Sequence, residues 1–211
     1  MNTSADAILF DLFGVIARNQ SPPAREALST LAGVAAPPFW DAYWKHRAAY
    51  DRAEVTATDY WHQIAATVGT SFDARRISAL VEADLASWIT VDDDMITLVR
   101  QTAASGRRVA LLSNIPEDLA VRYEHHHGRW LSQFEVVAFS CRTGLSKPDP
   151  AAYQWCCRAL GLAPENILFI DDRAENVAAA ERLGMRTHRF TGRDGAARAI
   201  AGTPAGPESR P

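Results

Sequence analysis

The chain has few cysteines, no surplus of basic charge and no long hydrophobic run, and each shortage excludes a class of protein. Its three cysteines are an odd number without CxxC spacing, which excludes a disulfide framework and fits reduced thiols. The 22 basic residues are fewer than the 25 acidic ones, so a net charge of −3 provides no basic surface for nucleic acid or an anionic membrane. No apolar stretch approaches the ~20 residues of a membrane-spanning helix. An acidic residue interrupts the N-terminal segment MNTSADAILFD before an export signal could form, so we expect a cytoplasmic protein.

The composition is typical of a globular protein with a substantial core. Of the 211 residues, 47% are hydrophobic and 22% are charged, which excludes a disordered chain. This length allows one domain, or one domain with a sizeable insertion. Residues 202–211 are rich in glycine and proline without an apolar anchor, and we expect them to form a flexible tail.

Five short apolar runs predict buried strands at 7–12, 109–113, 136–140, 167–171 and 186–190. Helix-like segments at 116–126, 150–160 and 174–183 follow the second, third and fourth runs. Alternation of apolar strands with helices is typical of an α/β fold in which helices cover both faces of a parallel sheet.

Roughly ninety residues separate the first two predicted strands, many more than a simple crossover needs. This interval has helical periodicity, so we expect a core of residues 1–16 and 93–201 and a helical insert of residues 17–92. We place the insert over the carboxyl edge of the sheet, where ligands of open α/β sheets bind. Its aromatic residues are interpreted as its own small core, with a substrate-stacking surface as the alternative: Trp40, Tyr43, Trp44, Tyr50, Tyr60 and Trp61.

Polar residues stand at the ends of three predicted strands and in one turn between them: Asp11, Ser113, Asn114, Lys147, Asp171 and Asp172. Three carboxylates at one sheet edge would repel one another, so we expect a hard cation among them, with Mg²⁺ the natural candidate. A lysine beside them would neutralise a bound anion, and a serine hydroxyl can donate to phosphate oxygens. A carboxylate in such a site can attack phosphorus.

These residues, in this order, resemble the four motifs of the haloacid dehalogenase-like (HAD) superfamily, and the resemblance covers nearly the whole chain. The motifs are DLFGV at 11–15, SN at 113–114, KP at 147–148 and DD at 171–172. The turn KPDP and the segment FIDDRAENV are most similar to small-molecule phosphatases of that superfamily. The resemblance implies a Rossmann-like core, a helical C1-type cap and a small phosphorylated metabolite as substrate; it leaves the oligomeric state open.

The resemblance also implies a role for each motif residue. Asp11 would be the nucleophile, and Lys147 would bridge the nucleophile and the phosphate. The residues implied for binding the phosphoryl group are Ser113, Asn114 through its backbone, and Lys147. The implied ligands of Mg²⁺ are Asp11, the backbone carbonyl of Phe13, Asp172, and Asp171 directly or through water.

Phe13 departs from the phosphatase pattern, which has an aspartate two residues after the nucleophile as general acid and base. The metal-independent L-2-haloacid dehalogenases resemble this chain in having an aromatic residue there, but they replace the paired acids corresponding to Asp171 and Asp172. Three hypotheses follow. The chain is an atypical Mg²⁺-dependent phosphatase, a dehalogenase in which Asp11 attacks carbon, or a catalytically weak protein that binds phosphorylated ligands or partners.

Each motif residue also has a plain structural alternative. Asp11, Ser113 and Asn114 could cap turns, Lys147 could be a surface charge, and either acid at 171–172 could cap the next helix. In that helix we expect Glu175 and Asn176 to be structural. Arg18, close behind the first strand, is a weaker candidate for touching substrate.

Overall fold

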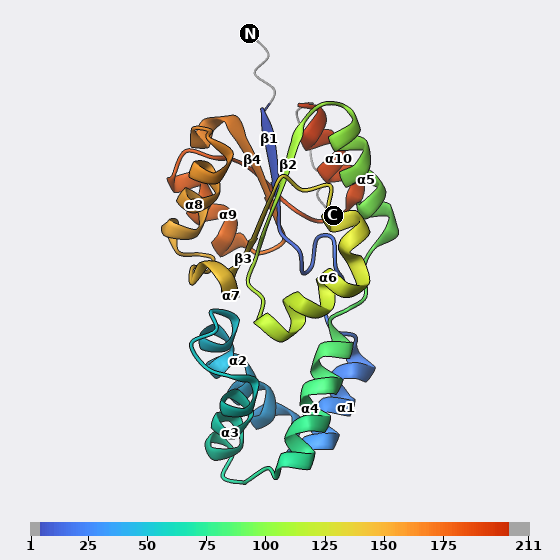
Figure 1. The fold of residues 1–211 in the computed structure, drawn as a ribbon, viewed down its shortest axis with the longest axis vertical. Coiled ribbons are helices and arrows are strands. Elements are labelled where there is room, and N and C mark those ends of the chain that lie inside the picture. Colours follow the sequence, from blue (N-terminus) through green and yellow to red (C-terminus); the bar gives the residue numbers. More distant parts are fainter. Residues whose placement is uncertain (1–4, 203–211) are drawn as a thin grey trace, which may run out of the picture.

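A five-stranded parallel sheet forms the centre of the protein in a computed structural model that describes residues 5–202 (Figure 1). In chain order the strands are β1 (Ala7–Phe10), β2 (Arg108–Ser113), β3 (Val136–Phe139), β4 (Ile167–Asp171) and β5 (Arg186–Arg189). They lie in the order β3-β2-β1-β4-β5, and every neighbouring pair is parallel. The α/β fold expected from the sequence is confirmed. The predicted tail, residues 202–211, lies outside the described residues from residue 203 on.

Helices cover both faces of the sheet, which explains why its central strands are apolar throughout. One face packs against α5 (Asp93–Ala104), α6 (Glu117–Leu131) and α10 (Arg193–Ala201), and the other against α8 (Pro150–Leu160) and α9 (Ala174–Arg182) (Figure 1). Ile8 and Phe10 of β1 pack into the hydrophobic core beneath α5, α6 and α10, whereas Ala7 and Leu9 pack into the core beneath α8 and α9. Short connections contain α7 (Ser140–Thr143) and the 3-10 helix η1 (Pro164–Asn166). Within residues 5–202, no helix combines the length and hydrophobicity that crossing a bilayer requires.

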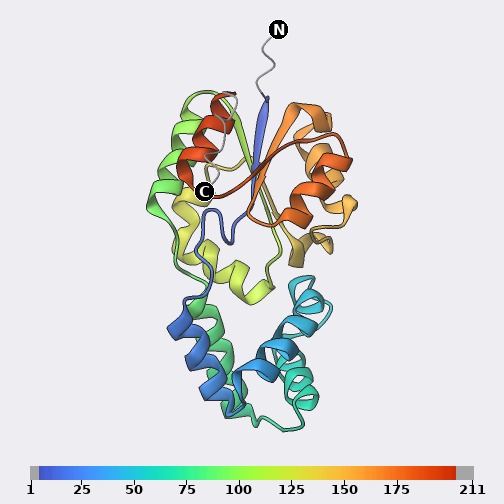
Figure 2. The same cartoon turned by 180° about the vertical axis from the view of Figure 1, so that it is seen from behind.

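Four helices form a helical lobe, residues 22–88, beyond the carboxyl ends of the strands (Figures 1 and 2). They are α1 (Pro22–Ala32), α2 (Ala36–Asp51), α3 (Ala57–Thr67) and α4 (Ala74–Ser87). The sequence starts α3 with a capping box, in which Thr56 and Asp59 satisfy each other's backbone N–H groups. Five of the six aromatic residues assigned to the core of the insert are buried there, but Trp44 is 48% exposed.

A buried arginine joins α2 to α4 inside this lobe. Arg47 Nε lies 2.7 Å from Asp51 Oδ1, and its Nη1 lies 3.4 Å from Asp84 Oδ2. The Tyr43 hydroxyl contacts Arg47 Nη1 and donates to Asp84 Oδ1 at 2.7 Å. Ser140 Oγ, from the core, donates to the Asp51 carbonyl at 2.6 Å. The C-terminal end of α2 is therefore fixed both within the lobe and, through α7, against the core.

Candidate active site

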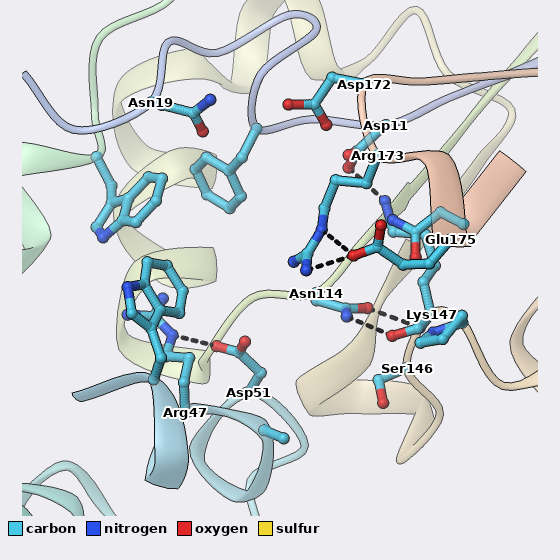
Figure 3. A pocket seen from close by; sticks show the side chains of 16 residues that line it. Asp11, Asn19, Arg47, Asp51, Asn114, Ser146, Lys147, Asp172, Arg173 and Glu175 are labelled. Atoms are coloured by element: carbon cyan, nitrogen blue, oxygen red, sulfur yellow. Dashed lines mark hydrogen bonds and ion pairs between the residues drawn. The ribbon is translucent and has the colours of Figure 1, made fainter. Parts of the chain in front are cut away.

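The carboxyl ends of three adjacent strands carry the polar residues predicted from the sequence. Asp11 follows β1, Ser113 ends β2 and Asp171 ends β4, and β1 pairs in parallel with both neighbours. Parallel pairing brings the three ends to the same edge of the sheet. A cavity of about 620 Å³ opens between this edge and the helical lobe (Figure 3). Asp11 lines it from the core, and Arg47 and Asp51 line it from the lobe.

The ammonium group of Lys147 lies between two carboxylates. Its Nζ lies 2.5 Å from Asp11 Oδ1 and donates to Asp171 Oδ2 at 2.8 Å, and its side chain is only 2% exposed. Asn114 holds the backbone of the same lysine, because Lys147 N donates to Asn114 Oδ1 at 2.9 Å and Asn114 Nδ2 donates to the Lys147 carbonyl at 2.8 Å. The peptide bond from Lys147 to Pro148 is cis. Both ends of the lysine are thus held in place.

Asp171 has hydrogen bonds on both carboxylate oxygens. Oδ1 accepts from Arg173 N at 2.8 Å, and Asn176 Nδ2 lies 3.0 Å from each oxygen. Burial opposes ionisation here, but the Lys147 ammonium and these hydrogen bonds outweigh it and lower the pKa of Asp171. Asp171 is therefore an ionised anchor for the lysine. Asn176 holds Asp171, which is the structural role expected of it.

Asp172, the next residue, keeps one oxygen free. Its Oδ1 is buried and has no hydrogen-bond partner within the described part of the chain. Burial, together with the negative charge of Asp171, raises the pKa of Asp172. Gly14, at φ +86°, leaves room for this carboxylate, because a Cβ there would lie 2.2 Å from Asp172 Oδ2. The loop after β1 therefore forms a cradle that only glycine allows.

The acids of the site outnumber its lysine. Burial raises the pKa of Asp11 well above its usual value. Burial alone would lower the pKa of Lys147, but its two carboxylate partners raise it, so the lysine keeps its proton. One oxygen from each of Asp11, Asp171 and Asp172 lies within 4.8 Å of the others. With all three acids ionised and one ammonium present, two negative charges remain, which a divalent cation would neutralise.

The donor groups fit a hard divalent cation such as Mg²⁺, which prefers oxygen ligands. Asp172 Oδ1 has no hydrogen bond and is free to act as a metal ligand, and a carboxylate oxygen of Asp11 lies close to it. The backbone hydrogen bonds of the loop after β1 use the carbonyls of Leu12 and Ala17, so the Phe13 carbonyl remains available. Asp171 differs, because its oxygens already accept four hydrogen bonds, which favours a contribution through water.

Ser113 and Asn114 offer different groups to a ligand. Ser113 is fully buried, and its Oγ has no partner among residues 5–202. A buried hydroxyl without a partner costs about 1–3 kcal/mol, and an oxygen of a bound anion would remove that cost. The Asn114 side chain is already used in holding Lys147, so its backbone is what remains for a ligand.

Several residues that line the cavity carry no sequence motif. Trp88 is one of them, and its ring packs edge-on against Phe13 of the first motif, with ring centroids 5.0 Å apart. Trp44 and Trp88 reach the cavity from the lobe side, and helical periodicity alone could not have identified them as lining residues. Arg173 Nε donates to Glu175 Oε1 at 2.7 Å, and both side chains line the cavity from the core (Figure 3).

Arg18, considered above as a substrate contact, is not among the residues that line this cavity. Its Nη2 instead lies 3.6 Å from Asp92 Oδ2.

Comparisons with known proteins point to one family. A family model described as haloacid dehalogenase-like hydrolase matches residues 5–184. The sesquiterpene phosphatase astK of Aspergillus oryzae is 25% identical over 186 residues, which are 88% of this chain and 89% of that protein.

Two solved structures share the fold. The HAD family enzyme BT-2542 of Bacteroides thetaiotaomicron, in complex with magnesium and inorganic phosphate, aligns with a TM-score of 0.67 at 19% identity, covering 86% of this chain and 92% of that one. L-2-haloacid dehalogenase of Xanthobacter autotrophicus aligns with a TM-score of 0.66 at 18% identity, covering 96% and 85%.

The cradle at Gly14 generates a prediction about stability. Gly14→Ala must adopt a left-handed backbone conformation, which costs about 1–2 kcal/mol, and must also displace the Asp172 carboxylate. Gly69→Ala is a matched control, since Gly69 has φ +73° but open space around its Cβ position. In urea unfolding, we expect Gly14→Ala to lower the free energy of unfolding by about 1–3 kcal/mol more than Gly69→Ala. Equal losses would show that Gly14 does not make room for Asp172.

Proposed function

This chain belongs to the haloacid dehalogenase-like hydrolase family, and from its site we propose that it is a Mg²⁺-dependent phosphatase. Its substrate in this proposal is a small phosphate ester, cleaved through an aspartyl-phosphate on Asp11. The observation that carries the proposal is the buried Lys147 bridge between Asp11 and Asp171, with Asp172 left free beside it. Of the described residues, 5–16 and 93–201 form the catalytic core in this proposal, and 17–92 act as a cap over it.

In the proposed reaction, an oxygen of Asp11 forms a bond to phosphorus as the bond from phosphorus to the ester oxygen breaks. The ester oxygen leaves with the electron pair of that bond, as an alkoxide or aryloxide, and takes a proton from water to become the alcohol. Lys147, which keeps its proton, offsets the negative charge on the phosphoryl oxygens, and the Ser113 hydroxyl and the Asn114 backbone N–H donate to them. Water then attacks phosphorus, which releases phosphate and restores the Asp11 carboxylate.

Mg²⁺ would be held by Asp11, Asp172 and the Phe13 carbonyl, with Asp171 contributing through water. When bound, it supplies positive charge beside the phosphoryl group. The structural similarity to an enzyme solved with magnesium and phosphate, and the relative named a phosphatase, support this choice.

Two other hypotheses are weaker. An aromatic residue at position 13 is also expected of a dehalogenase, but the Asp171 and Asp172 pair, with its excess negative charge, favours a metal-assisted phosphatase. A protein that only binds phosphorylated ligands would share the same site. That reading rests on Phe13, which offers no proton to the leaving group.

Product release under controlled metal conditions separates the three hypotheses. We expect the protein to release phosphate from p-nitrophenyl phosphate with Mg²⁺, to stop when EDTA is added, and to release no halide from 2-chloropropionate. With a phosphate analogue bound, Mg²⁺ should raise the melting temperature of the wild type in proportion to the logarithm of its concentration above Kd, and Asp172→Ala should reduce this shift. Halide release in EDTA would establish the dehalogenase. If neither phosphate nor halide is released, the hypothesis of a protein that only binds phosphorylated ligands is favoured.

Phe13 predicts a preference among phosphate esters. General acid catalysis contributes about 10²–10⁴-fold, and Phe13 cannot supply it. Esters whose leaving groups need no proton, such as aryl and acyl phosphates, should therefore exceed sugar phosphates in kcat/KM by about that factor. Phe13→Asp should raise kcat/KM for sugar phosphates selectively, while Phe13→Leu, which also loses the contact with Trp88, should not. The prediction fails if the wild type hydrolyses sugar phosphates as fast as aryl phosphates, because another residue must then donate the proton.

A further inference from the structure

Trp44 is an aromatic residue of the lobe that the lobe does not use for its own core. Its neighbours along α2, Trp40 and Tyr43, are 8% and 0% exposed, whereas Trp44 is 48% exposed. Trp44 lines the cavity that contains Asp11. A large apolar side chain that faces a binding cavity is available to contact whatever the cavity holds.

Trp44 is one end of a continuous aromatic wall, formed with Trp88 and Phe13. The ring centroids of Trp44 and Trp88 are 6.3 Å apart, and those of Trp88 and Phe13 are 5.0 Å apart. The polar atom of Trp88 is already satisfied, because its Nε1 donates to the Tyr43 hydroxyl at 3.1 Å. Apart from the indole N–H of Trp44, the wall therefore presents carbon from the loop beside Asp11 out to the surface of the lobe.

The polar side chains around this wall are mostly paired with one another. Arg47 and Asp51, on the lobe side in Figure 3, form an ion pair at 2.7 Å, and the Arg47 side chain is only 7% exposed. Asn114 is bound to Lys147 at both ends of its amide.

Apart from Asp172, whose Oδ1 has no partner, and the indole N–H of Trp44, Asn19 is the one polar lining residue whose side chain has no hydrogen bond within the described residues. A sugar would bring several hydroxyl groups into the cavity and find few free partners for them, which is costly once they are desolvated.

We propose that the cavity takes a phosphate monoester whose alcohol is an extended apolar group, with that group lying along Trp44, Trp88 and Phe13. This inference rests on the proposed function and deepens it by naming the substrate class. Phe13 then has a positive role, because an acid in its place would interrupt the wall next to the nucleophile. Trp44 becomes the residue that extends recognition beyond the first few carbon atoms.

A series of 4-n-alkylphenyl phosphates, from methyl to octyl, tests this without changing the acidity of the leaving group appreciably. In the wild type, kcat/KM should rise by about two- to fourfold per methylene until the cavity is filled, as expected for burying apolar carbon. Trp44→Ala should lower the octyl-to-methyl ratio of kcat/KM by about fivefold or more, and Trp44→Phe should restore most of it. Leu31→Ala removes another exposed apolar side chain of the same lobe, 37% exposed and outside the cavity, and should leave the ratio unchanged.

Binding of n-alkylphosphonates, measured by calorimetry in the presence of Mg²⁺, provides a second readout that needs no turnover. Affinity should rise with chain length in the wild type, and Trp44→Ala should flatten this dependence. Phosphate release with no dependence on chain length would overturn the inference and leave the phosphatase standing. A dependence that Trp44→Ala does not change would overturn the role of the wall. If no phosphate is released but binding depends on chain length and Trp44→Ala flattens that dependence, the proposed phosphatase activity is overturned and the apolar binding site is retained.

Discussion

The site depends on a buried ion pair network centred on the ammonium of Lys147. This group joins Asp11, at the end of β1, to Asp171, at the end of β4, and both contacts are almost completely removed from water. Breaking a buried pair by removing one partner is strongly destabilising, because the other charge is left uncompensated. The surrounding hydrogen bonds serve this network, since Asn114 fixes the lysine backbone and Asn176 fixes Asp171. Asp11, the proposed nucleophile, is thereby held in place before any substrate binds.

The same network leaves unpaired groups where the proposed cation and phosphate would bind. Lys147 offsets one carboxylate, while Asp172 keeps a buried oxygen without a partner and has a raised pKa. Ser113 likewise has a buried hydroxyl without a partner in residues 5–202. Buried polar groups are normally satisfied, so these exceptions are where a ligand is expected. The family's chemistry and the unsatisfied groups therefore lead to the same place on the sheet edge.

Much of this arrangement could be predicted from the sequence, because it depends on strand ends. Apolar runs such as 167–171 predict buried strands, and parallel pairing then brings Asp11, Ser113 and Asp171 together. The arrangement of the lobe could not be predicted in the same way. Helical periodicity assigns Trp40, Tyr43 and Trp44 to one aromatic helix, but which of them faces the cavity depends on how α2 packs against α4 and the core. The use of the Asn114 side chain to hold Lys147 is also a tertiary contact, without a local signal in the sequence.

The central claim is that Asp11 forms the bond to phosphorus, and Asp11→Asn tests it most directly. Asparagine preserves the size of the side chain, and Lys147 keeps its partner Asp171, so the fold should be retained in circular dichroism and urea unfolding. With Mg²⁺ and p-nitrophenyl phosphate, we expect phosphate release to fall to background, because the amide cannot act as the nucleophile. A well-folded Asp11→Asn protein that retains more than about a tenth of the wild-type rate would contradict the claim.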